Sequence, residues 1–148
     1  MLFGRDAERA HLEQVLDAVE SGPAGCIVEG TPGVGKTTLW RESVESARRR
    51  GYQVLETAPS EPDSALAFSG LSDLFEQLPD EVLGTLPEAQ ADALKAALSI
   101  GELPEGSRGL QALPRGVLGV LRHLCLGGPV VVAIDDEQWL DPASGAVP

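Results

Sequence analysis

Residues 30–37 read Gly30-Thr31-Pro32-Gly33-Val34-Gly35-Lys36-Thr37 and match the phosphate-loop pattern G-x-x-x-x-G-K-[ST] at every fixed position. The apolar run Cys26-Ile27-Val28 precedes the loop and predicts a strand over residues 25–29. A helix-compatible stretch from Lys36 to about Arg49 follows it. A strand, a glycine-rich loop and a helix in this order predict a site for a nucleoside triphosphate. A plain glycine-rich turn before a helix is the alternative.

The loop suits a triphosphate because backbone N–H groups can replace the water around its negative charges where small residues permit close approach. Lys36 is expected to reach the β- and γ-phosphates, the Thr37 hydroxyl to bind Mg²⁺, and Thr38 to contact the α-phosphate side. The helix N-terminus adds unpaired N–H groups and about half a positive charge. The other nucleotide-binding residues predicted in the loop are Gly30, Thr31, Pro32, Gly33, Val34 and Gly35.

A second candidate segment follows the continuous apolar run Val130–Ile134, which is typical of a strand buried on both faces of a parallel sheet. Asp135, Asp136 and Glu137 come directly after this run. Carboxylates at the carboxyl end of a parallel strand face the crevice where α/β sheets bind ligands. Asp135 is expected to hold Mg²⁺ through water. Asp136 is expected to orient or deprotonate the attacking water, and Glu137 is the competing candidate for that role.

Composition narrows the class of protein. The chain has 148 residues, of which 43% are hydrophobic, so it can bury a sizeable core as one domain. Its formal net charge of −12 argues against direct contact with nucleic acid, which needs clustered Lys and Arg. The basic run Arg48-Arg49-Arg50 suits the end of the helix after the loop. The sequence has no apolar run near the ~20 residues that span a bilayer and no signal-peptide pattern, which predicts a cytoplasmic protein without a membrane partner.

Periodicity and turn residues predict the remaining elements. A second strand is expected over residues 52–57, and a Pro/Gly-rich connection over Gly101–Gly109. Cys26 and Cys125 lack metal or redox spacing and are expected to be buried free thiols. Further helices are expected from Asp6 to about Glu20, from Leu66 to Leu78, from Pro87 onward, and from Pro114 to about Leu126.

Four segments of the chain carry a resemblance to a known family, and they are residues 3–8, 30–37, 66–74 and 134–141. Together they resemble the N-terminal ATPase module of large ATP-binding regulators of the LuxR type, which are signal-transducing (STAND) P-loop ATPases related to AAA proteins. The Asp-Asp-x-x-Trp-x-Asp ending of residues 135–141 is more specific to that group than the phosphate loop. The resemblance implies a switch that binds ATP, responds to an inducer through helical repeats and activates transcription through a C-terminal helix-turn-helix. It also implies that Gly4 and Arg5 lie near the adenine.

The resemblance also implies parts that the sequence up to Pro148 does not contain. These are a strand with a polar sensor between the phosphate-loop strand and the Asp135 strand, a helical lid, an arginine that senses the γ-phosphate, the helical repeats and the DNA-binding domain. The sequence is therefore interpreted as a fragment. Without a central strand, residues 26–29 and 130–134 would have unpaired edges, which predicts marginal stability or self-association.

These observations together predict an α/β fold: a P-loop NTPase three-layer sandwich with a parallel sheet, incomplete at its C-terminus, in one domain over residues 1–148 with a helical insertion at about 59–128. The predicted function is binding of ATP and Mg²⁺ as the nucleotide-sensing module of a transcriptional regulator, with slow hydrolysis in the full protein. A free-standing P-loop ATPase or kinase, and a degenerate fragment that acts only in protein interaction, are the alternatives.

Overall fold

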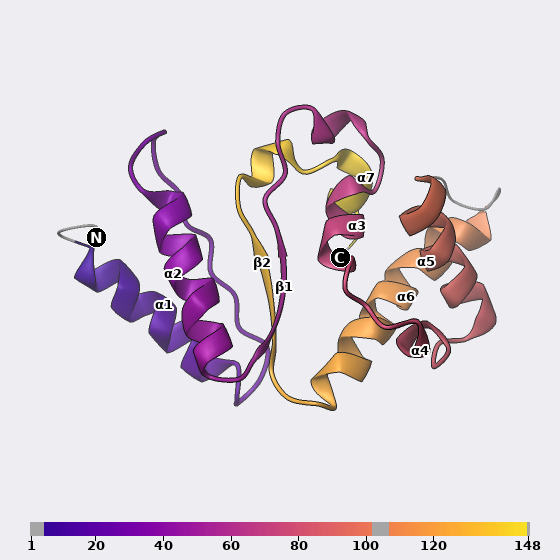
Figure 1. Cartoon of the computed structure of the whole chain (residues 1–148), viewed down its shortest axis with the longest axis horizontal. Coiled ribbons are helices and arrows are strands. Elements are labelled where there is room, and N and C mark those ends of the chain that lie inside the picture. Colours follow the sequence, from indigo (N-terminus) through magenta and orange to yellow (C-terminus); the bar gives the residue numbers. More distant parts are fainter. Residues whose placement is uncertain (1–4, 102–106, 148) are drawn as a thin grey trace.

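A parallel pair of strands lies at the centre of the computed structural model, which describes residues 5–101 and 107–147 (Figure 1). Strand β1 (Gln53–Thr57) pairs with β2 (Val130–Ile134) in a register that places Gln53 opposite Val130 and Thr57 opposite Ile134. Both strands are rich in β-branched or long apolar residues, which suit a half-buried pleated surface. The expected α/β class with a parallel sheet is confirmed, and β2 has the bounds that its sequence predicts.

Helices cover both sides of the sheet and make three layers (Figure 1). On one side, α2 (Lys36–Arg49) packs on both strands, and α1 (Asp6–Ala18) packs on α2. The small core there contains Leu16, Ala47 and Tyr52. Arg50, the last residue of the basic run, donates to Glu13 and Asp17 of α1 at 2.5 and 2.6 Å. This part of the basic run is therefore engaged in ion pairs within the protein.

The layer on the other side of the sheet is formed mainly by the helices that lie between β1 and β2 in the sequence. They are a 3-10 turn η1 (Asp63–Ala65), α3 (Ser69–Leu74), α4 (Asp80–Leu83), α5 (Glu88–Ile100) and α6 (Ser107–Cys125). Their main core contains fully or nearly fully buried side chains such as Leu94, Leu113 and Val120. No helix in residues 5–101 and 107–147 has both the length and the apolar character needed to cross a membrane.

Two helices of this layer differ from their predicted bounds. The helix predicted over 66–78 is shorter, because Phe68 adopts a left-handed conformation (φ 61°) and α3 begins only at Ser69. The helix predicted from Pro114 begins at Ser107, so Pro114 lies inside α6. The expected connection over Gly101–Gly109 is therefore helical from Ser107, and residues 102–106 lie outside the described residues.

The strand predicted over residues 25–29 is wrong. These residues are exposed and belong to no strand, and Ile27 and Val28 are 78% and 37% exposed. No backbone hydrogen bond in the described part of the chain joins residues 24–30 to another segment. A strand is stable only when a neighbouring strand accepts and donates its hydrogen bonds, and neither β1 nor β2 pairs with this segment.

The prediction of buried thiols is also wrong. Cys26 and Cys125 are free, as expected, but both are exposed. Cys26 lies in the unpaired segment, and Cys125 is the last residue of α6. Burial of each thiol would have needed a strand or helix packed over it.

Candidate nucleotide-binding site

The phosphate loop is a tight turn, and its geometry requires glycine at three positions for steric reasons. Gly33 and Gly35 have φ of 80° and 94°, a region that strains residues with a Cβ. Gly30 has no room for a side chain, since a Cβ there would lie 2.9 Å from Cγ1 of Val34. A hydrogen bond from the Val34 N–H to the Thr31 carbonyl, at 3.3 Å, closes the turn. The loop therefore brings its backbone against the start of α2.

The first turn of α2 presents free N–H groups to this loop. Gly35 is the N-cap, and no side chain among the residues that the structure describes caps the helix. The first turn carries no acidic residue. The first N–H groups of a helix have no partner within it, and the helix dipole makes this end positive. The segment Gly35–Thr38 therefore has the chemistry of an anion site.

Lys36 adds a full positive charge at the same place. Its Nζ donates to the carbonyl oxygens of Gly30 and Thr31 at 2.9 and 3.4 Å, so the half-buried side chain folds back over the loop. Both hydrogen bonds are exposed. An anionic ligand can therefore attract the ammonium group without the loss of a buried contact.

Arg5 links the N-terminal segment to the loop. Its Nη2 donates to the Val34 carbonyl oxygen at 2.9 Å, and its Nη1 donates to Glu8 at 2.9 Å. This places the guanidinium of Arg5 beside the phosphate loop, 29 residues away in sequence. Gly4, which the resemblance places near the adenine, lies outside the described residues.

The acidic segment begins where β2 ends. The Asp135 N–H donates to the carbonyl oxygen of Thr57 at 3.0 Å, which continues the strand pairing by one residue. The Asp135 side chain is 7% exposed, and its Oδ1 accepts from the Asp136 N–H at 3.1 Å. Asp136 has φ 49° and turns the chain from the strand into the short helix η2 (Glu137–Trp139). Such strain in a residue other than glycine is often found at functional sites.

The two candidates for positioning water differ in their contacts. Asp136 is exposed, and its Oδ1 accepts from Nε2 of Gln138 at 3.1 Å. Glu137 is exposed as the first residue of η2. Trp139, the last residue of η2, is partly buried.

The loop and the acidic segment lie at the same end of the molecule. Figure 1 shows the indigo loop before α2 and the yellow turn after β2 at the upper end. Within residues 5–101 and 107–147, no hydrogen bond or ion pair joins the two segments. The structure therefore brings the predicted residues into two groups, one at each segment.

The residues present fit Mg²⁺ only together with a nucleotide. The described part of the chain contains no group of three or more His, Cys, Asp or Glu that could hold a metal. The oxygen donors available are the Thr37 hydroxyl, which is half-buried, and the buried Asp135 carboxylate. Because Mg²⁺ keeps several waters and accepts phosphate oxygens as ligands, one or two protein donors are sufficient. Bound Mg²⁺ would neutralise charge on the phosphates.

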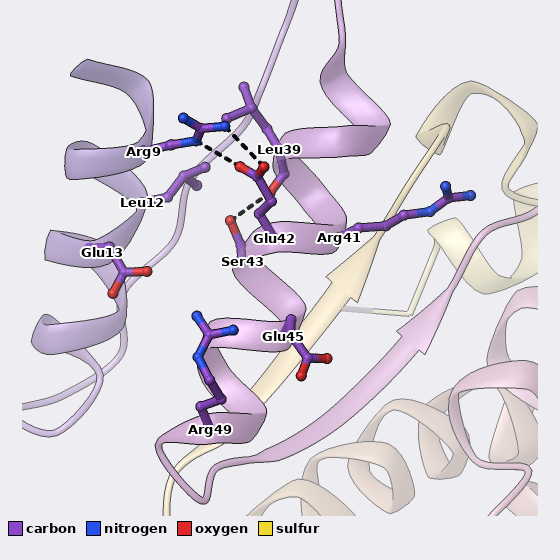
Figure 2. Close-up of a pocket in the computed structure, with 9 residues that line it drawn as sticks. All are labelled: Arg9, Leu12, Glu13, Leu39, Arg41, Glu42, Ser43, Glu45 and Arg49. Carbon is purple, nitrogen blue, oxygen red and sulfur yellow. Dashed lines mark hydrogen bonds and ion pairs between the residues drawn. The ribbon is translucent and has the colours of Figure 1, made fainter. Parts of the chain in front are cut away.

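The hollow between α1 and α2 is a different kind of surface (Figure 2). It has a volume of about 610 Å³ and contains none of the predicted site residues. Across it, Nε and Nη2 of Arg9 donate to the two carboxylate oxygens of Glu42 at 2.7 and 3.0 Å (Figure 2). The hydrogen bond from Arg9 lowers the pKa of Glu42 below its usual value, despite partial desolvation. These two paired charges join α1 to α2 across the hollow.

Sequence reasoning gave Asp141 no role of its own. It is the last residue of the specific ending of residues 135–141, and its side chain is fully buried. The structure shows it as the N-cap of the short helix α7 (Pro142–Gly145), accepting from the Ser144 N–H at 2.8 Å. An Asp directly before a Pro is a recognisable helix-start signal. That signal predicts the cap, but it does not predict the long-range contacts of Asp141.

Fold and loop together define an α/β P-loop module in which a glycine-rich turn leads into an uncapped helix N-terminus. The AAA ATPase domain family matches residues 1–147. The chain belongs to this family, and membership implies that it binds a nucleotide.

One curated relative is an uncharacterized protein of Rhizobium meliloti (strain 1021). It is 28% identical to this chain over 173 aligned residues, which cover 97% of the chain and 16% of the relative. The chain thus spans about a sixth of the length of the curated relative it matches. No solved structure matches the chain significantly.

Proposed function

We propose that this chain binds ATP with Mg²⁺ and serves as the nucleotide-sensing module of a transcriptional regulator of the LuxR type. One observation supports the proposal that the chain binds a nucleotide. The uncapped N-terminus of α2 and the Lys36 ammonium lie at the same glycine-rich turn. A triphosphate is the ligand whose charge best matches this arrangement.

Each residue has a distinct role in this proposal. Lys36 binds the β- and γ-phosphates, while the Thr37 hydroxyl and the Asp135 carboxylate, partly through water, hold Mg²⁺. Asp136 or Glu137 positions the attacking water. Hydrolysis is expected to be slow and to occur in the longer protein. The proposal assigns the arginine that stabilises charge on the phosphates to the longer protein. Arg5, whose guanidinium lies beside the loop, donates to the Val34 carbonyl oxygen and to Glu8.

The regulatory part rests on the resemblance of four segments to the ATPase module of LuxR-type regulators. It is compatible with the family assignment and with a match that covers only 16% of the relative. Membership in the AAA ATPase domain family alone also fits the free-standing ATPase or kinase. An open reading frame that continues beyond Pro148 into helical repeats and a helix-turn-helix would support the regulator.

Calorimetric titration with Mg-ATP tests the nucleotide part. Lys36→Ala is expected to weaken binding by at least about tenfold, because it removes a charge-assisted contact to the phosphates. Lys95→Ala is the matched control, since Lys95 is the only other lysine and is exposed on α5. Equal binding by the wild type and Lys36→Ala would contradict the proposal and favour a fragment that acts only in protein interaction.

A further inference from the structure

Asp141 accepts hydrogen bonds from two separate parts of the chain. Its Oδ1 accepts from the N–H groups of Ser144 and Phe68, both at 2.8 Å. Its Oδ2 accepts from the Gly70 N–H at 3.1 Å and from Oγ of Ser69 at 3.3 Å. Phe68, Ser69 and Gly70 lie more than 70 residues earlier in the sequence. A helix cap needs only the first of these contacts, so the other three join the segment after β2 to the start of α3.

The residues around Asp141 are also closely packed. A side chain at Gly70 would overlap Cδ1 of Leu140, so the backbone of α3 lies directly against the residue before Asp141. The Leu71 N–H donates to Oγ of Ser144 at 3.0 Å. Phe68 adopts its left-handed conformation at the place where its N–H meets Asp141. The start of α3 and residues 140–144 therefore form one interlocked unit.

A second contact holds α3 to the sheet. Oγ1 of Thr57 donates to Oδ2 of Asp73 at 3.0 Å, and the Thr57 carbonyl oxygen accepts from the Asp135 N–H at 3.0 Å. Thr57 is buried, with 3% of its surface exposed. The segment from Asp135 to Asp141 is thus held at its first residue by β1 and at its last residue by α3.

The proposed function assigns Mg²⁺ to Asp135, the first residue of this segment, and the attacking water to Asp136 or Glu137, which lie between the two anchors. Asp136 is exposed and has a strained backbone, and the side chain of Glu137 makes no hydrogen bond to any of the residues that the structure describes. A segment with exposed, strained residues keeps one conformation only if its ends are fixed. The buried carboxylate of Asp141 supplies the fixed end on the α3 side.

We infer that Asp141 is a positioning residue, which holds the segment from Asp135 to Glu137 in the conformation that binds Mg²⁺ with the nucleotide. The inference rests on the proposed function. It also makes α3, through Asp141, an element whose movement would change the metal site.

The test is the gain in ATP affinity that Mg²⁺ produces, measured by calorimetry on the full chain as the ratio of Kd without and with Mg²⁺. Asp141→Asn keeps the size of the side chain but replaces an accepting oxygen with a donor. It is expected to leave Mg²⁺-free ATP binding unchanged within about twofold and to reduce the Mg²⁺ gain by at least about fivefold. Asp135→Asn is also expected to reduce the Mg²⁺ gain, because it weakens the metal ligand itself.

A general loss of stability must be separated from a loss of positioning. Leu94→Ala creates a cavity in the helical core, where Leu94 is completely buried on α5, and is expected to keep the Mg²⁺ gain. All variants are titrated at a temperature at which circular dichroism shows them folded. If Asp141→Asn does not fold, Ser144→Ala replaces it. That variant removes the acceptor of the Leu71 N–H but keeps Asp141, and a partial loss of the Mg²⁺ gain is expected.

A double-mutant cycle shows whether Asp141 acts through Asp135. If it does, the double variant Asp135→Asn/Asp141→Asn loses no more of the Mg²⁺ gain than Asp135→Asn alone. A Mg²⁺ gain kept within about twofold by Asp141→Asn, or additive losses in the cycle, would overturn the inference and leave the proposed function intact. Absence of Lys36-dependent ATP binding in the wild type would overturn both.

Discussion

At the scale of single residues, Gly33 and Gly51 form a matched pair. Their φ values are 80° and 78°, and a Cβ on either would meet no atom within 4 Å. Gly33→Ala and Gly51→Ala are each expected to lower the free energy of unfolding by about 1–2 kcal/mol, because alanine is strained in the left-handed region. Only Gly33→Ala is expected to weaken ATP binding as well, since Gly33 shapes the phosphate loop. Urea denaturation and ATP titration check the two expectations, and equal ATP affinities would contradict a role for the loop conformation.

The ionised carboxylate of Asp141 predicts a dependence of stability on pH. Burial alone would raise the pKa of Asp141, but the hydrogen bonds from Ser144, Gly70 and Phe68 outweigh it and hold the pKa below its usual value. The stabilisation is therefore present above the pKa of the unfolded chain, about 3.9, and is lost as the pH falls through the lower folded value. Asp141→Asn is expected to lower the free energy of unfolding by about 2–3 kcal/mol at pH 7.

The measurement for Asp141 is urea denaturation of the wild type and Asp141→Asn at pH 7, 4 and 3. The difference between them is expected to shrink below about pH 4, as the wild-type carboxylate becomes protonated. Asp92→Asn, at an exposed position on α5, is the control and is expected to be close to neutral. A difference that stays constant from pH 7 to 3 would show that the charge of Asp141 does not contribute.

At the scale of elements, the packing of α5 on α6 stabilises the helical layer. Leu94 of α5 is completely buried, whereas Leu118 of α6 is 44% exposed. Leu94→Ala is expected to lower the free energy of unfolding by about 2–5 kcal/mol and Leu118→Ala by less than about 1 kcal/mol. Similar losses in denaturant titrations of the two variants would indicate that α5 does not pack as described.

The helices and strands also show which features of the fold local sequence patterns can predict. The 3.6-residue pattern and Gly or Pro boundaries predicted α2 and α5 well, and a continuous apolar run predicted β2, because these signals are local. The same reasoning failed for α3, whose start is set by the left-handed Phe68 and its contact with Asp141. It failed again for residues 25–29, which have strand-like residues but pair with neither strand of the sheet. For α3 the deciding partner, Asp141, lies in a distant part of the chain. For residues 25–29 the deciding fact is that neither β1 nor β2 pairs with them.

At the scale of the whole molecule, β2 presents an edge that β1 does not cover. Side chains of β2 remain partly open, with Val132 46% and Ile134 36% exposed, and the separate segment at Ile27 is also apolar. Unpaired strand edges favour pairing with another chain. The protein is therefore expected to self-associate in sedimentation velocity runs as its concentration rises, and Val132→Lys is expected to reduce this association.

The control for that prediction is Leu126→Lys, which places the same charge at an exposed leucine (84%) just beyond α6. It is expected to leave self-association unchanged, because Leu126 does not lie on a strand edge. A concentration-independent monomer with a sharp, cooperative melt would contradict the prediction.

The sequence by itself determined the phosphate loop, the lysine within it, the strand before Asp135 and the helical periodicity. Each depends on residues that are neighbours along the chain, and the steric demands of Gly30, Gly33 and Gly35 are local. Only the tertiary structure decided that residues 25–29 stay unpaired and that Asp141 is buried against the start of α3. The physical reason is that strand pairing and the burial of a charge depend on hydrogen-bond partners, and those of Asp141 lie up to 73 residues away.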